Sequence, residues 1–116
     1  MTKDTCLFCK IVKRDIPAKI VFEDNKILAF EDIRPQAPVH IVIIPKYHID
    51  RISDANEENI HLIGSLMLAA GNIARSRKID ASGYRIVVNC NKDGGQEVYH
   101  LHLHLLGGRP MTWPPG

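Results

Sequence analysis

Residues 99–106 read Tyr99-His100-Leu101-His102-Leu103-His104-Leu105-Leu106, so that histidine alternates with leucine. A period of two is typical of a β-strand, because successive side chains of a strand point to opposite faces. The stretch therefore predicts a strand with its three imidazoles on one face. The leucines would lie on the other face, where they can pack against a helix.

The three imidazoles are spaced too widely to act on one centre. At a rise of about 3.3 Å per residue, His100 and His104 would stand roughly 13 Å apart. One end of this face is therefore expected to serve one centre, while the middle and the far end serve another. Neutral imidazole suits nucleophilic attack, proton transfer or metal ligation. The alternative is a solvated face, for which Thr or Val would be better strand formers.

The composition is that of an ordinary globular protein, and we expect one domain over residues 1–116 with its own core. The net charge is +2 and no run of five like charges occurs, so neither nucleic-acid nor membrane binding is predicted. The first residues lack an apolar run, and no apolar stretch reaches membrane-spanning length. Three cysteines argue against a disulfide framework, and we expect a cytoplasmic protein.

The rest of the chain predicts an α+β fold with an antiparallel sheet of about five strands, one short helix and one long helix. Besides the histidine stretch, strands are expected at 19–23, 26–31, 39–44 and 84–89, with a short helix at 6–12 and a glycine-containing hairpin loop at 91–96. Segment 39–44 is almost wholly apolar and β-branched, which predicts a central strand covered on both sides. His40, its one polar residue, is either a satisfied core histidine or a partner of the histidine face.

The long helix is expected to run from Ser53 or Asp54 to about Lys78, with Asp54 and Glu57 resembling an N-terminal cap. Apolar residues spaced three and four apart form a stripe that should pack against the leucine face. The stripe consists of Ile60, Ile63, Met67, Ala70 and Ala74.

The motif and its surroundings resemble the histidine-triad superfamily, whose signature is His-x-His-x-His followed by two apolar residues, here residues 100–106. The closer resemblance is to its Hint branch, the adenosine phosphoramidases, and it covers nearly the whole chain. It rests on FEDIRPQAPVH at 30–40, Gly-Gly-Gln at 94–96, Gly-Gly-Arg at 107–109 and Trp-Pro-Pro-Gly at 113–116.

The resemblance implies a homodimer that binds a purine nucleoside monophosphate or phosphoramidate and hydrolyses P–N bonds of the adenosine 5′-phosphoramidate type, with no catalytic cofactor. It assigns the nucleophile to His102, which would form a nucleotidyl-histidine intermediate. His104 would contact the phosphate and His40 would support His102.

The resemblance also implies the nucleotide contacts. Asp32 would accept hydrogen bonds from the ribose hydroxyls, and Asn89 with the Glu97-Val98 segment would contact phosphate oxygens. The residues that resemble the base-sandwiching positions are apolar: Phe8, Ile11, Ile16, Phe30 and Ile33.

Glu97 departs from the family pattern, because some members carry serine at this position. A hydroxyl there offers a proton route to the leaving amine, and Glu97 would take that role only if its surroundings kept the carboxyl protonated. Alternatively, Glu97 shapes specificity. The sequence leaves both roles open.

Cys6 and Cys9 have the Cys-x-x-Cys spacing of two ligands in a tetrahedral zinc site. Some histidine-triad relatives bind zinc through two cysteines and two histidines, and on that resemblance His48 and His100 are the other candidates. Such a zinc would be structural, because four protein ligands leave no open position for chemistry. The alternative is a pair of thiols that pack as small apolar groups.

Three functions are consistent with these residues. The first is a nucleoside phosphoramidase, and the second is a dinucleoside polyphosphate hydrolase or nucleotidyl transferase that uses the same intermediate. The third is a purine-nucleotide-binding scaffold protein. The C-terminal end favours the first, and analogy with similar tails predicts that Trp113 reaches the other subunit's site.

Overall fold

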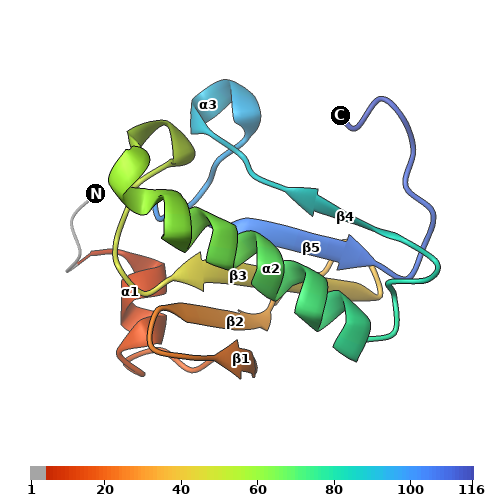
Figure 1. Ribbon diagram of the computed structural model, residues 1–116, viewed down its shortest axis with the longest axis horizontal. Helices are drawn as coiled ribbons and strands as arrows, with labels where there is room; N and C mark the ends of the chain where they lie inside the picture. Colours follow the sequence, from red (N-terminus) through yellow and green to blue (C-terminus); the bar gives the residue numbers. More distant parts are fainter. Residues whose placement is uncertain (1–4) are drawn as a thin grey trace.

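The computed structural model describes residues 5–116 and shows an α+β fold (Figure 1). Its sheet has five antiparallel strands in the order β1-β2-β3-β5-β4. The predicted fold class is therefore confirmed. The strands are β1 (Ile20–Glu23), β2 (Ile27–Glu31), β3 (Val39–Pro45), β4 (Tyr84–Val87) and β5 (Leu103–Gly107), and the helices are α1 (Leu7–Val12), α2 (Ile60–Ser76) and the short α3 (Asn91–Gly94).

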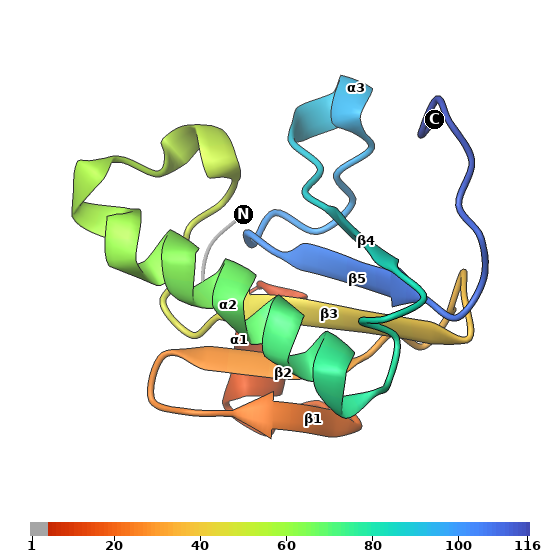
Figure 2. The same cartoon turned by 45° about the vertical axis from the view of Figure 1, so that its right-hand side comes forward.

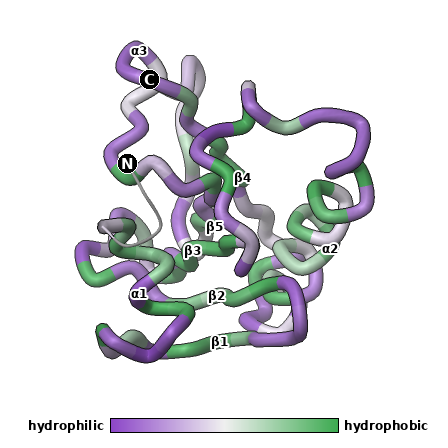
Figure 3. The backbone as a smooth tube through the Cα atoms, turned by 90° about the vertical axis from the view of Figure 1, so that its left-hand side faces the viewer, coloured by the Kyte–Doolittle hydropathy of each residue, from purple (hydrophilic) through white to green (hydrophobic). Residues whose placement is uncertain are grey.

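Strand β3 is central and covered on both faces, as its apolar sequence predicts. Ile41 and Ile43 belong to the core cluster under α2, whereas Val42 and Ile44 belong to the cluster under α1. Figure 3 shows the hydrophobic strands between these two helices. The sheet thus has two different faces, and the short helix covers the one that carries the site.

The histidine stretch alternates as predicted, but its first half, residues 99–102, precedes strand β5. Leu101, Leu103 and Leu105 are buried in the α2-side core. The strand itself begins only at Leu103, so the expected strand over the whole stretch is wrong. The register pairs Ile43 with Leu103, and two residues further Pro45 lacks the amide that would continue the ladder. The N–H of Leu101 instead donates to the carbonyl of Ile49 (2.7 Å).

The long helix begins later than predicted, because two 3₁₀ turns at Ile52–Asp54 and Glu57–Asn59 precede it. Asn56 caps the second of these turns, which runs directly into α2: its side chain accepts from the N–H of Glu58 (2.9 Å), and its own N–H donates to the side chain of Asn59 (3.0 Å). Asp54 instead pairs with Arg51 (2.9 Å). The expected Asp54 cap is therefore wrong.

The buried face of α2 is also rotated from the predicted stripe. Ala70 and Ala74 are buried as expected, but Ile60 and Met67 are exposed. The buried residues are Leu66, Ala69, Ala70, Ile73 and Ala74. Apolar residues occur around much of this helix, so spacing alone could not select the face, and the small alanines allow the sheet to approach closely. Leu68 is left 72% exposed.

Residues 88–102 connect β4 to β5 and include α3 where a hairpin loop was predicted. Gly95 ends this helix with φ +79°, a left-handed conformation that glycine adopts without steric cost. Figure 2 shows α3 and the C-terminal tail extending beyond the sheet on the β4 side. Across residues 5–116, no helix has the length and apolar character needed to cross a membrane.

Candidate active site

A cavity of about 440 Å³ lies beside the histidine stretch. Its walls come from the β2–β3 loop, from the β4–β5 connection and from the start of α1. Nine of the predicted site residues line it: Phe8, Asp32, Ile33, His40, Asn89, Glu97, Val98, His102 and His104. Its volume lies within the range of about 300–1,000 Å³ that is typical of ligand pockets.

Three of the predicted base contacts do not line this cavity. Ile11 and Phe30 are buried in the α1-side core, where the ring of Phe30 contacts Phe8 (centroids 5.5 Å apart). Ile16 packs against the same core and lines a separate surface pocket. These three residues therefore pack in or against the core cluster that contains Phe8, and Phe8 is the member of that set which lines the cavity.

His102 is held by a main-chain group. Its Nδ1 lies 2.7 Å from the carbonyl oxygen of His100, which can only accept, so Nδ1 carries the proton. Nε2 is then the unprotonated nitrogen. Burial lowers the pKa of His102, although the carbonyl and the charge of Asp32 act in the opposite direction. The ring is therefore kept neutral with one nitrogen lone pair available, as a nucleophile requires.

His40 contacts His104 and not His102, which corrects the expected support. Nε2 of His40 lies 2.9 Å from Nδ1 of His104. The register explains this, because His104 faces Val42 across the sheet and His40 is its diagonal neighbour on the same face. The orienting group for His102 is the carbonyl of His100.

A main-chain amide sets the tautomers of both rings in this pair. The N–H of Gln36 donates to Nδ1 of His40 (3.0 Å), so the proton of a neutral His40 is on Nε2. That proton is donated to Nδ1 of His104, and the proton of His104 is therefore on its Nε2. His102 thus offers a lone pair and His104 an N–H donor in one cavity.

Burial keeps the pair neutral. It lowers the pKa of His40, against the opposing charge of Asp32, whose carboxylate lies 3.5 Å from His40 Nε2. Burial, reinforced by His102 and His40, lowers the pKa of His104 from 6.5 to about 4. The tautomers deduced above therefore hold at neutral pH.

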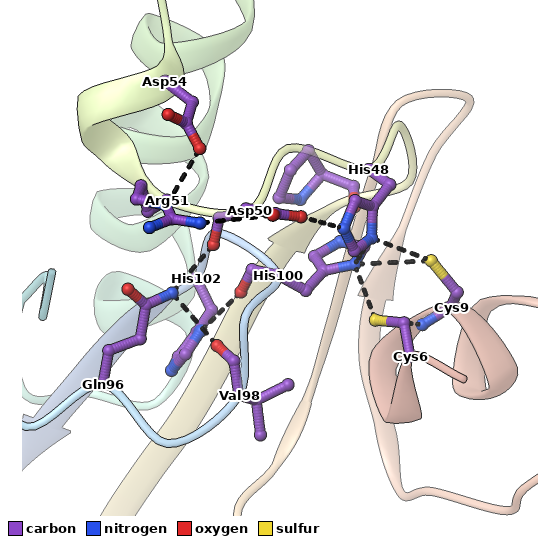
Figure 4. A network of polar contacts seen from close by, with 11 residues as sticks. Cys6, Cys9, His48, Asp50, Arg51, Asp54, Gln96, Val98, His100 and His102 are labelled. Carbon is purple, nitrogen blue, oxygen red and sulfur yellow. Dashed lines mark hydrogen bonds and ion pairs between the residues drawn. The ribbon is translucent and has the colours of Figure 1, made fainter. Parts of the chain in front are cut away.

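The four predicted metal ligands, Cys6, Cys9, His48 and His100, lie together in a second cluster next to the cavity histidines. The two sulfur atoms of Cys6 and Cys9 and the Nδ1 atoms of His48 and His100 all lie within 4.8 Å of one another (Figure 4). Nδ1 of His100 is 3.3 Å from the sulfur of Cys6, and the two Nδ1 atoms are 3.1 Å apart. Tetrahedral zinc would place N and S about 3.6 Å apart and two nitrogens about 3.4 Å apart.

The Nε2 atoms of His100 and His48, which point away from the cluster, each have a hydrogen-bond partner. Nε2 of His100 donates to the carbonyl of Pro45 (2.7 Å), and Nε2 of His48 donates to the carboxylate of Asp50 (2.6 Å). The Nδ1 atoms of both rings therefore face the centre of the cluster, where each can offer a lone pair to a metal ion. This arrangement, with a carbonyl or carboxylate behind each ring, is typical of metal-binding histidines.

Phe8 contacts both the cysteine–histidine cluster and the cavity histidines. Its ring meets the rings of His100 and His102 edge-on, with centroids 5.9 Å and 5.1 Å away. Gln96 supports the opposite wall, donating to the carbonyls of Asp50 (2.8 Å) and Val98 (3.1 Å) (Figure 4).

Several groups of the site give no clear signal in the sequence. The carbonyl of His100 and the amide of Gln36 are main-chain groups, which any residue type would provide. Asp50 follows His48 by two residues, and this His-x-acid spacing could have signalled it. The other additional cavity residues are Leu7, Arg34, Val42 and Gly95.

The fold and the histidine-lined cavity define a histidine-triad protein. Residues 13–111 match the HIT domain model, and the chain belongs to this family. It is 52% identical over 116 residues, 100% of both chains, to an uncharacterized HIT-like protein of Synechococcus elongatus.

Solved structures agree with this assignment. A HIT family hydrolase from Legionella pneumophila superimposes with a TM-score of 0.95 at 57% identity, covering 97% of this chain and 100% of that one. A histidine triad nucleotide-binding protein from Candida albicans has a TM-score of 0.81 at 29% identity, covering 95% and 83% of the two chains.

The lowered pKa of His104 predicts a pH-dependent stability. Between pH 6.5 and about 4 the unfolded chain takes up a proton that the folded His104 does not, so the free energy of unfolding falls as the pH falls. His104→Asn keeps an acceptor for His40 but cannot titrate. Urea unfolding at pH 7 and pH 5 should show a decline about 1–2 kcal/mol smaller in this variant, a range reduced for partial exposure.

His61→Asn, at an exposed position on α2, is the matched control and should decline as the wild type does. An equal decline in His104→Asn and wild type would contradict the neutral His40–His104 pair.

Proposed function

We propose that the protein is a nucleoside phosphoramidase of the Hint branch, which hydrolyses P–N bonds of the adenosine 5′-phosphoramidate type. The observation that carries the proposal is the state of His102: buried, neutral, held at Nδ1 by a carbonyl and placed in a cavity beside a second imidazole. The family relationship to a HIT family hydrolase and to a histidine triad nucleotide-binding protein supports it.

The proposed reaction has two displacements. Nε2 of His102 attacks phosphorus, the P–N bond to the amine breaks, and the departing nitrogen takes up one proton. Water then attacks phosphorus, the bond to Nε2 breaks, and water releases the balancing proton. The carbonyl of His100 stabilises the positive ring formed in between, and splitting the reaction in two lowers each barrier.

The remaining cavity residues would bind the nucleotide. The Nε2–H of His104 would donate to a phosphate oxygen, and main-chain N–H groups of the Glu97-Val98 segment, which lines the cavity, would donate to the others without a metal. Asp32 is half-exposed at the cavity edge, where its carboxylate would accept hydrogen bonds from the ribose hydroxyls. Phe8 and Ile33 would contact the base.

We further propose that Cys6, Cys9, His48 and His100 hold a structural zinc ion. The inward lone pairs and the near-tetrahedral distances support this role. All four ligands come from the protein, so the metal would supply cross-linking between α1 and the sheet and no chemistry.

A homodimer is proposed as the working form. Strand β4 is the last strand of the sheet, and the exposed apolar residues Ile60, Met67 and Leu68 on α2 continue the surface beside it. Tyr84 joins the two elements, since its hydroxyl lies 3.8 Å from the position a Cβ would have at Gly71. Burying such a surface against its copy would remove it from water. In that dimer, the exposed Trp113 would extend toward the partner's site.

His102→Ala is expected to reduce hydrolysis of adenosine 5′-phosphoramidate by about 10³-fold or more, because no other cavity residue replaces the nucleophile. It should also lose the radiolabelled nucleotide that wild type retains after an alkaline quench, in which a P–N bond to histidine survives. His61→Ala is the control.

Faster hydrolysis of a dinucleoside polyphosphate than of the phosphoramidate would favour the second function. Tight AMP binding without either turnover would leave only the scaffold role.

Cys9→Ser should lose the bound zinc and lower the melting temperature, whereas Cys90→Ser, a half-buried cysteine outside the cluster, should keep both. With free zinc a thousand-fold above Kd, the metal would stabilise the fold by about 4 kcal/mol. Elemental analysis and thermal unfolding with a chelator measure these effects. A protein that contains no zinc when purified from zinc-supplemented cultures would contradict the site.

Leu68→Glu is expected to produce monomers, because it places a charge in the proposed apolar interface. Light scattering after size exclusion measures the mass, with Leu68→Met as the matched control. A monomeric wild type would contradict the dimer.

A further inference from the structure

Glu97 is an anomaly in a cavity that is proposed to bind a phosphate. It lines the same cavity as His102 and His104, and its side chain is exposed. Within residues 5–116 its carboxylate makes no hydrogen bond or ion pair. The other carboxylate of the cavity, Asp32, is engaged: it accepts from the N–H of Arg34 (2.8 Å) and faces His40.

A carboxylate beside an anionic phosphate is repulsive unless a cation lies between them. Within the described residues, the one cationic side chain that lines the cavity is Arg34. It lies on the β2–β3 loop, whereas Glu97 lies on the β4–β5 connection that forms the other wall. Within one chain, the cation that pairs with Glu97 would therefore come with the ligand.

The nucleotide part of the ligand does not supply this charge, because phosphate is anionic and purine and ribose are neutral. In a P–N substrate, the part that remains is the amine that leaves. An amine that carries a second, protonated amino group would bring an ammonium to the carboxylate.

We propose that Glu97 is a specificity-determining residue which selects nucleoside phosphoramidates whose leaving amine carries an additional positive charge. The inference rests on the proposed phosphoramidase function and names the substrate class of that site. The ammonium of the leaving amine pairs with the Glu97 carboxylate and offsets its repulsion of the phosphate. Glu97 thereby acts on the choice of substrate through charge.

Two adenosine phosphoramidates of matched length test this role, one made from 1,4-diaminobutane and one from pentylamine. The wild type should prefer the cationic substrate by roughly 2- to 5-fold in kcat/KM at low salt, the size of an exposed ion pair. Glu97→Gln should bring the ratio to about 1. Added salt should do the same in the wild type, because it screens the pair.

Asp93→Asn is the matched control, since it removes an exposed carboxylate from α3 in the same connection without touching the cavity. This variant should keep the wild-type ratio. Glu97→Lys should invert the preference, and circular dichroism checks that each variant is folded. A preference of Glu97→Lys for the neutral substrate would support the charge mechanism independently of the lost preference in Glu97→Gln.

Equal rates of the wild type on the two substrates would overturn the inference and leave the phosphoramidase function intact. A ratio unchanged in Glu97→Gln would overturn it as well. If Mg²⁺ increased the hydrolysis of both substrates in the wild type but not in Glu97→Gln, a free divalent cation and not the amine would pair with the Glu97 carboxylate. That result would overturn the inference. No turnover of either substrate by the wild type would overturn the proposed function and this inference with it.

Discussion

The hydrogen bond from Nδ1 of His102 to the carbonyl of His100 is the contact on which the site depends. His100 connects the two clusters: its ring belongs to the cysteine–histidine cluster, and its carbonyl accepts the hydrogen bond from the candidate nucleophile. Its ring is itself fixed by the carbonyl of Pro45, at the end of the central strand. The geometry of His102 is thus transmitted from the sheet through the main chain, so it does not depend on a flexible side chain.

Burial then decides what these imidazoles can do. A solvated histidine is partly protonated near neutral pH, and a protonated ring cannot attack phosphorus. Desolvation lowers the pKa values of His40, His102 and His104, and directional partners select which nitrogen keeps its proton. A main-chain acceptor leaves His102 with a free lone pair, while the amide of Gln36 acts through His40 to make His104 a donor. Two chemically identical side chains thereby acquire opposite roles.

Much of the architecture was predictable, because it follows from local periodicity. The alternation around His102 correctly assigned three leucines to the core, and the β-branched run at 39–44 correctly predicted a central strand. The errors occurred where several solutions satisfy the same pattern. Apolar residues surround much of α2, so the spacing predicts that Met67 is buried, whereas the structure buries Leu66. Asp54 and Asn56 are both capping residue types, and only the path of the chain shows which one caps.

The sequence by itself determined the α+β class, the two faces of the histidine stretch and the set of residues capable of chemistry, because alternation and residue type are local properties. Only the tertiary structure decided that His40 partners His104, that Ile11, Ile16 and Phe30 lie behind the cavity, and that Cys6 and Cys9 meet His48 and His100. The physical reason is that these relations depend on strand register and on main-chain hydrogen bonds. Neither the register nor a main-chain hydrogen bond can be read from the identity of the residues involved.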